Sequence, residues 1–165
     1  MQEQKVLDIL KSAILLEKRG HAFYSKVAST TKGEAVRKFF EHMAQEEVQH
    51  VELLARQYKS YQKNGAFVKE ELAANEEVVD AILTEKIKSE IEASGFEAAA
   101  ISSAIDFEKR AVELYGKRAL VATDPEEKAL YEWRSKWEQT HLDDLVKLDE
   151  ELQEKVWYDN NFWPT

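Results

Sequence analysis

The chain has 165 residues, of which 44% are hydrophobic and 33% charged, with only 5 glycines and 2 prolines, as is typical of a helical protein with one core. Its net charge of −9 argues against a nucleic-acid partner, because binding phosphates needs a basic surface. Cysteine is absent, which excludes disulfides, iron–sulfur clusters and a rubredoxin-type iron centre within these residues. No apolar run is long enough for a membrane span or a signal peptide, so we expect a cytoplasmic protein without a membrane partner.

Two long helices are predicted in the first half of the chain. The first spans about 4–28, where apolar residues recur in steps of three and four, as in a bundle helix. Thr31 and Glu34 then form a capping-box pattern, which predicts the start of the second helix. That helix ends near 64–65, where the pair Asn-Gly signals a turn or a C-cap.

A long connection, from 66 to about 93, separates these helices from the second half of the chain. A short helix is predicted within it, near 77–91, and its length permits the helices on either side to run parallel. Ser94 and Glu97 form a second capping-box pattern, which opens the third long helix. The fourth begins with Pro125 in its first turn, where the missing N–H does no harm.

The two halves of the chain form an internal repeat. Residues 13–28 match residues 104–119 at Ala, Ile, Glu, Lys, Arg, Tyr, Lys and Ala, without a gap. The period is far too long for a solenoid, so we expect an all-α four-helix bundle built from a duplicated helical hairpin with a long crossover. The bundle should occupy 1–155. The aromatic tail, 156–165, either packs back onto it or docks a partner or a second subunit, as in a homodimer.

Six glutamate and histidine side chains fall on helix positions that should be apolar. They are Glu17, Glu47, His50, Glu108, Glu138 and His141. The two Glu-x-x-His motifs begin 91 residues apart (138 − 47), and the two upstream glutamates keep the same offset (108 − 17). Such a shared register in both halves of a repeat is hard to reconcile with six unrelated surface residues.

Metal binding is the simplest explanation of this pattern. Residues three apart lie on one face of a helix, so each Glu-x-x-His motif can reach a single ion. Buried unpaired charges are costly, and two divalent cations would neutralise the four carboxylates. Mixed oxygen and nitrogen ligands suit iron or manganese, and zinc also binds such groups.

This set of ligands resembles that of ferritin-like di-iron bundles, and the sequence is similar to the rubrerythrins among them. The resemblance covers about 6–152. It rests on the Glu-Lys-Arg-x-x-x-x-Tyr stretches, Glu17 to Tyr24 and Glu108 to Tyr115, and on the two Glu-x-x-His motifs. One such motif alone is a weak signal, whereas two with upstream glutamates in register form a strong one.

The resemblance also implies a role for each residue. Glu47 and Glu138 would bridge the two ions, and Glu17 and Glu108 would be terminal ligands on opposite ions. His50 and His141 would each supply one nitrogen ligand. Tyr24 and Tyr115 would donate hydrogen bonds to the site carboxylates. The implied cofactor is a pair of iron ions.

Two departures from the rubrerythrin pattern bear on function. Rubrerythrins carry a rubredoxin domain that feeds electrons to the iron, and this chain has no cysteine, so an external donor such as a rubredoxin-type protein is expected. Rubrerythrins also place a glutamate three residues after the ligand that corresponds to Glu108, and its ligation changes with redox state. Here that position is Ala111, so their peroxide mechanism does not carry over automatically.

Three further polar residues lie near the motifs. His21 is one turn from Glu17, but its counterpart in the second half is Val112, so a supporting role beside the metal ligands or in the core is favoured over metal ligation. His42 falls off the buried stripe and is expected in solvent. Glu46 either orients His141 or is a plain surface charge, and both interpretations stay open.

The function that the resemblance implies is reduction of hydrogen peroxide to water by a di-iron oxidoreductase. A ferroxidase, or an iron-handling or dioxygen-reducing protein, would use the same centre. A third hypothesis, from another class, is a structural or interaction bundle that metal ions stabilise without turnover.

Overall fold

The computed structural model describes residues 1–72, 81–91 and 95–157. Within these ranges the chain forms five helices and no strand: α1 Gln2–Thr30, α2 Glu34–Asn64, α3 Ala81–Glu90, α4 Phe96–Val121 and α5 Pro125–Trp157. The predicted all-α bundle is confirmed. Most of the short helix expected in the crossover is present as α3, although residues 73–80 lie outside the described ranges.

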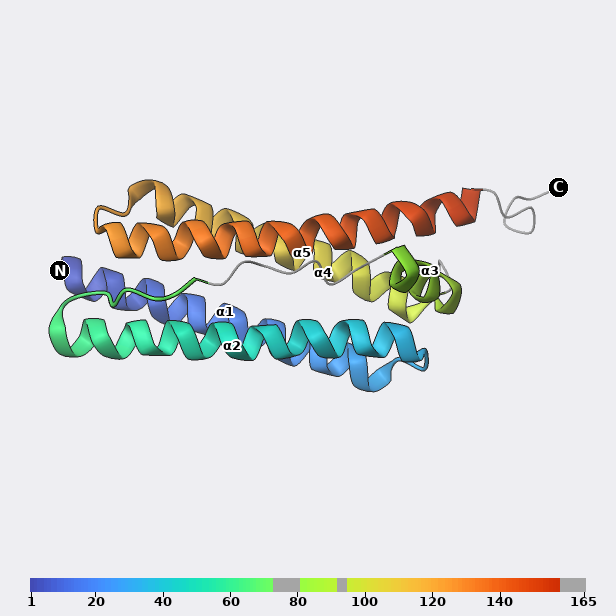
Figure 1. The fold of residues 1–165 in the computed structure, drawn as a ribbon, viewed down its shortest axis with the longest axis horizontal. Coiled ribbons are helices and arrows are strands. Elements are labelled where there is room, and N and C mark those ends of the chain that lie inside the picture. The colour runs from blue at the N-terminus through green and yellow to red at the C-terminus, as the bar shows by residue number, and fades with distance from the viewer. Residues whose placement is uncertain (73–80, 92–94, 158–165) are drawn as a thin grey trace.

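The four long helices are arranged as two hairpins. α1 packs along α2 and α4 packs along α5, while the short α3 contacts α2 and α5. Figure 1 shows that α2 and α4 run in the same direction, which the long crossover permits. No helix in the described part of the chain is both long and apolar enough to cross a membrane.

The core is divided along its length into two apolar clusters. One contains Tyr24, Phe40, Ile101 and Leu145 among its buried members. The other contains Leu10, Leu54, Tyr115 and Leu130. In every long helix a buried charged residue falls between the stretch that joins one cluster and the stretch that joins the other. The middle of the bundle is therefore polar, with an apolar cluster on each side of it.

The start of α2 differs from the sequence prediction. The proposed capping box of Thr31 and Glu34 is wrong, since no side-chain cap of this helix is found within the described ranges. Instead the backbone N–H groups of Ala35 and Val36 donate to the Glu90 carboxylate of α3, at 3.2 and 3.0 Å. An acceptor from a distant segment thus takes the place of the local cap.

The other helix ends follow the sequence more closely. The carboxylate of Asp124 accepts the backbone N–H groups at the start of α5, and Gly65 ends α2 in the left-handed conformation, with φ of 66°. At the start of α4, Ser94 lies outside the described residues and Gly95 is the N-cap. Glu97 accepts a hydrogen bond from the hydroxyl of Thr31 at 2.9 Å, which ties α4 to the end of α1.

Candidate metal centre

Six polar side chains from the four long helices meet in the middle of the bundle. They form two groups in which one ligand atom of every residue lies within 4.8 Å of the others: Glu17, Glu47, His50 and Glu138, here called the Glu17 group; and Glu47, Glu108, Glu138 and His141, here called the Glu108 group. Glu47 and Glu138 belong to both groups, and all six side chains are at most 2% exposed. The structure therefore brings together all the residues that the sequence predicts as metal ligands.

Several buried atoms of this centre have no hydrogen-bond partner among the described residues. They are both carboxylate oxygens of Glu47, Oε2 of Glu108 and of Glu138, and Nδ1 of His50 and of His141. A buried polar atom in this state costs roughly 1–3 kcal/mol. A divalent cation binds carboxylate oxygens and neutral imidazole nitrogens, so this donor set fits two metal ions of the iron, manganese or zinc type.

Two tyrosines tie the carboxylates across the two hairpins. Tyr24 of α1 donates its hydroxyl hydrogen to Oε1 of Glu108 on α4, and Tyr115 of α4 donates to Oε1 of Glu17 on α1. Burial raises the pKa of both tyrosines well above the usual value, and the accepting carboxylates raise it further. Both phenols therefore stay protonated and remain donors, while the second oxygen of each carboxylate is left to face the centre.

Glu46 holds His141 in place from outside the two groups. Its Oε2 lies 2.5 Å from Nε2 of His141, and its Oε1 lies 3.1 Å from Nε2 of His42, which is exposed as expected. Glu46 is itself buried. Of the two interpretations left open by the sequence, the geometry supports the orienting one, because a hydrogen bond at Nε2 directs Nδ1 of His141 toward Glu108 and Glu138, at 3.6 and 3.4 Å.

His50 is oriented in a different way. Its Nδ1 lies 3.6 Å from Oε2 of Glu17 and 3.6 Å from Oε2 of Glu47. Trp137, at the position of the repeat that corresponds to Glu46, places its ring edge-on, with centroids 5.2 Å apart. The two imidazoles thus face the carboxylates in the same manner, but His141 is supported by the carboxylate of Glu46 and His50 by the ring of Trp137.

His21 lies near the centre in sequence but not in contact with it. Its Nδ1 is hydrogen-bonded to the backbone carbonyl of Ala44 at 2.8 Å, and its Nε2 lies 3.5 Å from the hydroxyl of Ser25. Among the described residues it joins neither ligand group. The contact with Ala44 links α1 to α2, so of the two supporting roles expected for His21 the contacts favour a hydrogen-bonded histidine in helix packing.

Arg134 of α5 is a member of the centre that the sequence analysis missed. It is fully buried, and its Nη2 donates to Oε1 of Glu17 at 2.7 Å and to Oε1 of Glu138. A signal was available, because Arg134 lies one helical turn before Glu138 and so shares its buried face. The repeat gave no support, however, since the corresponding position is Met43 (134 − 91).

The geometry agrees with the comparison to known proteins. The family model for rubrerythrin matches residues 8–149. The chain belongs to the rubrerythrin family. No curated protein and no solved structure matches it significantly. Membership supports a ferritin-like di-iron protein, in line with the buried donor set.

Glu17, Glu47 and Glu138 of this rubrerythrin-family centre differ in how readily they hold a proton. Burial raises the pKa of Glu138 to about 7, although Arg134 opposes the shift. Burial also raises the pKa of Glu47 well above its usual value, and repulsion from Glu17 and Glu138 adds to this. For Glu17 the effect of burial is outweighed by the charge of Arg134 and by hydrogen bonds, which hold its pKa well below the usual range. Without metal, the two shared glutamates therefore hold a proton more readily than Glu17 does.

The two imidazoles differ as well. Burial lowers the pKa of His50, and the nearby charge of Arg134 lowers it further. Burial has the same effect on His141, but the nearby carboxylates of Glu108, Glu138 and Glu46 raise its pKa well above the usual value. In the metal-free protein His141 therefore holds a proton more strongly than His50 does, and a metal ion at His141 has to displace it.

Small residues bring the helices close together beside the centre. A Cβ atom on Gly20 would lie 3.0 Å from the ring of Phe107 and 3.4 Å from the carboxyl carbon of Glu47, so a larger residue would press on both. The matching position in the second half is Ala111, which is buried in an apolar cluster. The centre of this family member therefore has no glutamate at the position where rubrerythrins carry a redox-responsive one.

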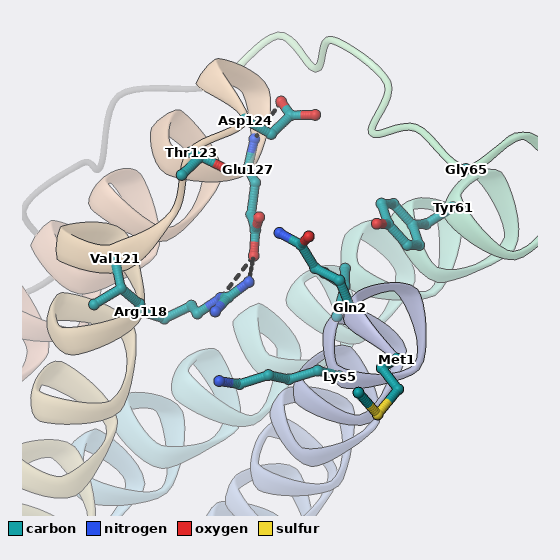
Figure 2. Close-up of a pocket in the computed structure, with 11 residues that line it drawn as sticks. Met1, Gln2, Lys5, Tyr61, Gly65, Arg118, Val121, Thr123, Asp124 and Glu127 are labelled. Carbon is teal, nitrogen blue, oxygen red and sulfur yellow. Dashed lines mark hydrogen bonds and ion pairs between the residues drawn. The ribbon is translucent and has the colours of Figure 1, made fainter.

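A separate hollow, of about 460 Å³, lies at the end of the bundle where α1 begins and α4 ends. Figure 2 shows its lining, with Lys5 extending toward Arg118, and Arg118 paired with Glu127. Its cations are surface groups or are already paired with carboxylates. This hollow is formed by helix ends, whereas the metal-ligand candidates lie in mid-helix, so it is not part of the centre.

Proposed function

We propose that this rubrerythrin-family chain is a non-haem di-iron oxidoreductase that reduces hydrogen peroxide to water. The proposed ligands of the two iron ions are Glu17, Glu47, His50, Glu108, Glu138 and His141. The observation that carries the proposal is the pair of buried groups that share Glu47 and Glu138, with unpartnered donor atoms among the described residues. Two adjacent iron ions would supply one electron each, which matches the two electrons that cleavage of an O–O bond requires.

The side chains around the centre have defined tasks in this proposal. Tyr24 and Tyr115 hold one oxygen of the outer carboxylates, so that the other oxygen stays available to metal. Glu46 keeps Nδ1 of His141 directed inward. The apolar clusters on both sides limit the access of water, which strengthens the electrostatic interactions inside.

Electrons and protons must come from outside the bundle. Reduction of one peroxide to two waters consumes two electrons and two protons. The chain has no cysteine to hold a second iron centre, so we propose an external donor protein of the rubredoxin type. Manganese or zinc would also fit the ligands, but zinc would not support this redox reaction.

A ferroxidase or dioxygen-reducing function is the main competing hypothesis. Ala111 favours it, because the residue that rubrerythrins use to change ligation during peroxide reduction is replaced here by a methyl group. The remaining ligands would serve either reaction.

Stopped-flow absorbance distinguishes these functions. The protein is loaded anaerobically with Fe(II) and mixed with hydrogen peroxide or with dioxygen, and oxidation of the iron is followed. We expect peroxide to react faster. Faster reaction with dioxygen would favour the oxidase or ferroxidase, and no oxidation of a fully loaded centre would favour a metal-stabilised structural bundle.

The variant Glu138→Ala should lose the reaction. Glu132→Ala, at an exposed position of the same helix α5, is its control.

A further inference from the structure

Arg134 places a permanent positive charge inside a centre that is suited to bind cations. Its side chain is fully buried and bonds to Glu17 and Glu138 through a single nitrogen, Nη2. A guanidinium stays charged at every pH at which a protein folds. Protons on carboxylates and imidazoles can leave when a metal ion arrives, but this charge cannot.

The contacts of Arg134 are distributed unequally between the two ligand groups. The Glu17 group has three carboxylates, and two of them, Glu17 and Glu138, bind the guanidinium. In the Glu108 group only Glu138 does so. The repeat position that corresponds to Arg134 is Met43, which lies in an apolar cluster and carries no charge. The pseudo-symmetry of the bundle is therefore broken at this point.

Arg134 also occupies oxygen atoms that a metal ion would use. Oε1 of Glu17 accepts hydrogen bonds from both Tyr115 and Arg134, which leaves Oε2 for metal. Oε1 of Glu138 is held by Arg134 as well, so that Oε2 is its one unpartnered oxygen within the described structure. Glu47, by contrast, keeps both oxygens available. Of the two shared glutamates, only Glu47 can offer one oxygen to each ion without displacing the arginine.

The charge balance points in the same direction. Once the protons that metal displaces have left, the four carboxylates and Arg134 together carry an excess of three negative charges. After the first divalent ion has bound, the second meets an excess of only one. Two ions together would leave the centre with one positive charge, since the carboxylates alone balance two divalent cations. Attraction therefore falls steeply between the first ion and the second.

We propose that Arg134 makes the two metal positions unequal, so that the Glu108 group fills first and tightly and the Glu17 group second and more weakly. This inference rests on the proposed metal centre. It assigns Arg134 a positioning role, because the residue sets the affinity of one position through the carboxylates it holds.

Titration with Mn²⁺ alone, followed by electron paramagnetic resonance, tests the inference on the full chain without any turnover. In the wild type we expect isolated Mn²⁺ at one equivalent and spin-coupled pairs only as a second equivalent is added, with dissociation constants that differ at least about tenfold. Arg134→Met introduces the residue found in the other half. It should tighten the second constant about tenfold or more, and pairs should already form at one equivalent.

Two further variants separate the effect of the positive charge at position 134 from the effect of removing an arginine side chain. Arg134→Lys keeps the charge and should keep the positions unequal. Arg118→Met removes an arginine–glutamate pair at the end of the bundle and should leave the isotherm unchanged.

Each contrary outcome has a definite meaning. Two equal positions in the wild type would overturn the inference even if Arg134→Met failed to fold. Unequal positions that persist unchanged in Arg134→Met would also overturn it, as would equal positions in Arg134→Lys. A wild type that binds no Mn²⁺ and no iron would instead overturn the proposed metal centre, and the inference with it.

Discussion

Replacing Glu138 by glutamine should change how the stability of the metal-free protein depends on pH. Burial raises the pKa of Glu138 from 4.5 to about 7. The folded state then binds a proton that the unfolded state has lost, so stability falls as pH rises between these two values. From pH 5.5 to pH 7 the interval is about 1.5 units, which at 1.36 kcal/mol per unit gives a loss of about 2 kcal/mol from this residue alone.

Neighbouring groups also contribute to the slope. The raised pKa values of Glu47 and His141 act in the same direction, because both favour the protonated form in the folded state. The lowered pKa of His50 acts in the opposite direction below its unfolded value of 6.5. Glu17 has a lowered pKa, so its stabilisation is lost only at more acidic pH, outside this interval.

Urea unfolding in the presence of chelator, at pH 5.5 and pH 8, measures the effect. Glu138→Gln should unfold with a pH difference smaller by about 2 kcal/mol than the wild type, since glutamine does not titrate but can still accept a hydrogen bond from Arg134. Glu132→Gln, on the exposed side of the same helix, should behave like the wild type. Equal slopes in the wild type and Glu138→Gln would refute the proposed clustering of charge.

Three other predictions concern the same centre. Chelation should lower the midpoint of thermal unfolding at neutral pH, because the buried ligand atoms then lose the ions that bind them, and an unchanged midpoint after confirmed loss of metal would contradict this. Glu138→Ala should reduce the metal content measured by mass spectrometry more than Glu46→Ala does, since only Glu138 belongs to the ligand groups. Tyr24→Phe should destabilise the metal-free protein by about 1.5–3 kcal/mol, the range for a hydrogen bond to a charged group. Tyr115→Phe should cost less, because Arg134 still donates to the same oxygen of Glu17, and a larger loss in urea unfolding would count against this geometry.

The ligand residues could be found from the sequence because the repeat doubled the signal. Glu17 and Glu108 occupy the same register in the two halves, and so do the two Glu-x-x-His motifs. Each of these polar residues therefore recurs in both halves of the repeat, on a helix face that is otherwise apolar. The length of the crossover permitted a parallel course of α2 and α4, and the structure shows that the helices adopt it.

Features without a counterpart in the repeat were missed or left undecided. Arg134 lies one turn before Glu138, but an arginine in an amphipathic helix is usually exposed, and its counterpart in the repeat is Met43, so the symmetry did not support its burial. Glu46 corresponds to Trp137, and only the structure shows its hydrogen bond to His141. Contacts of this kind occur in only one half of the repeat and depend on how the helices pack against one another.

The failed capping box has a similar physical origin. Thr31 and Glu34 have the correct spacing for a local cap, but Glu90 of α3 reaches the free N–H groups of α2. Thr31 instead bonds to Glu97, 66 residues away. Local patterns cannot anticipate an acceptor that arrives from a distant segment.

Anomalous X-ray scattering from crystals of the iron-loaded protein, recorded above and below the iron edge, tests the central claim most directly. We predict two iron ions per chain in the middle of the bundle, with Glu47 contacting both, with Glu138 bound through its Oε2, and with His50 and His141 each on a different ion. A metal-saturated crystal in which these side chains bind no ion, or in which the ions lie elsewhere, would contradict the account.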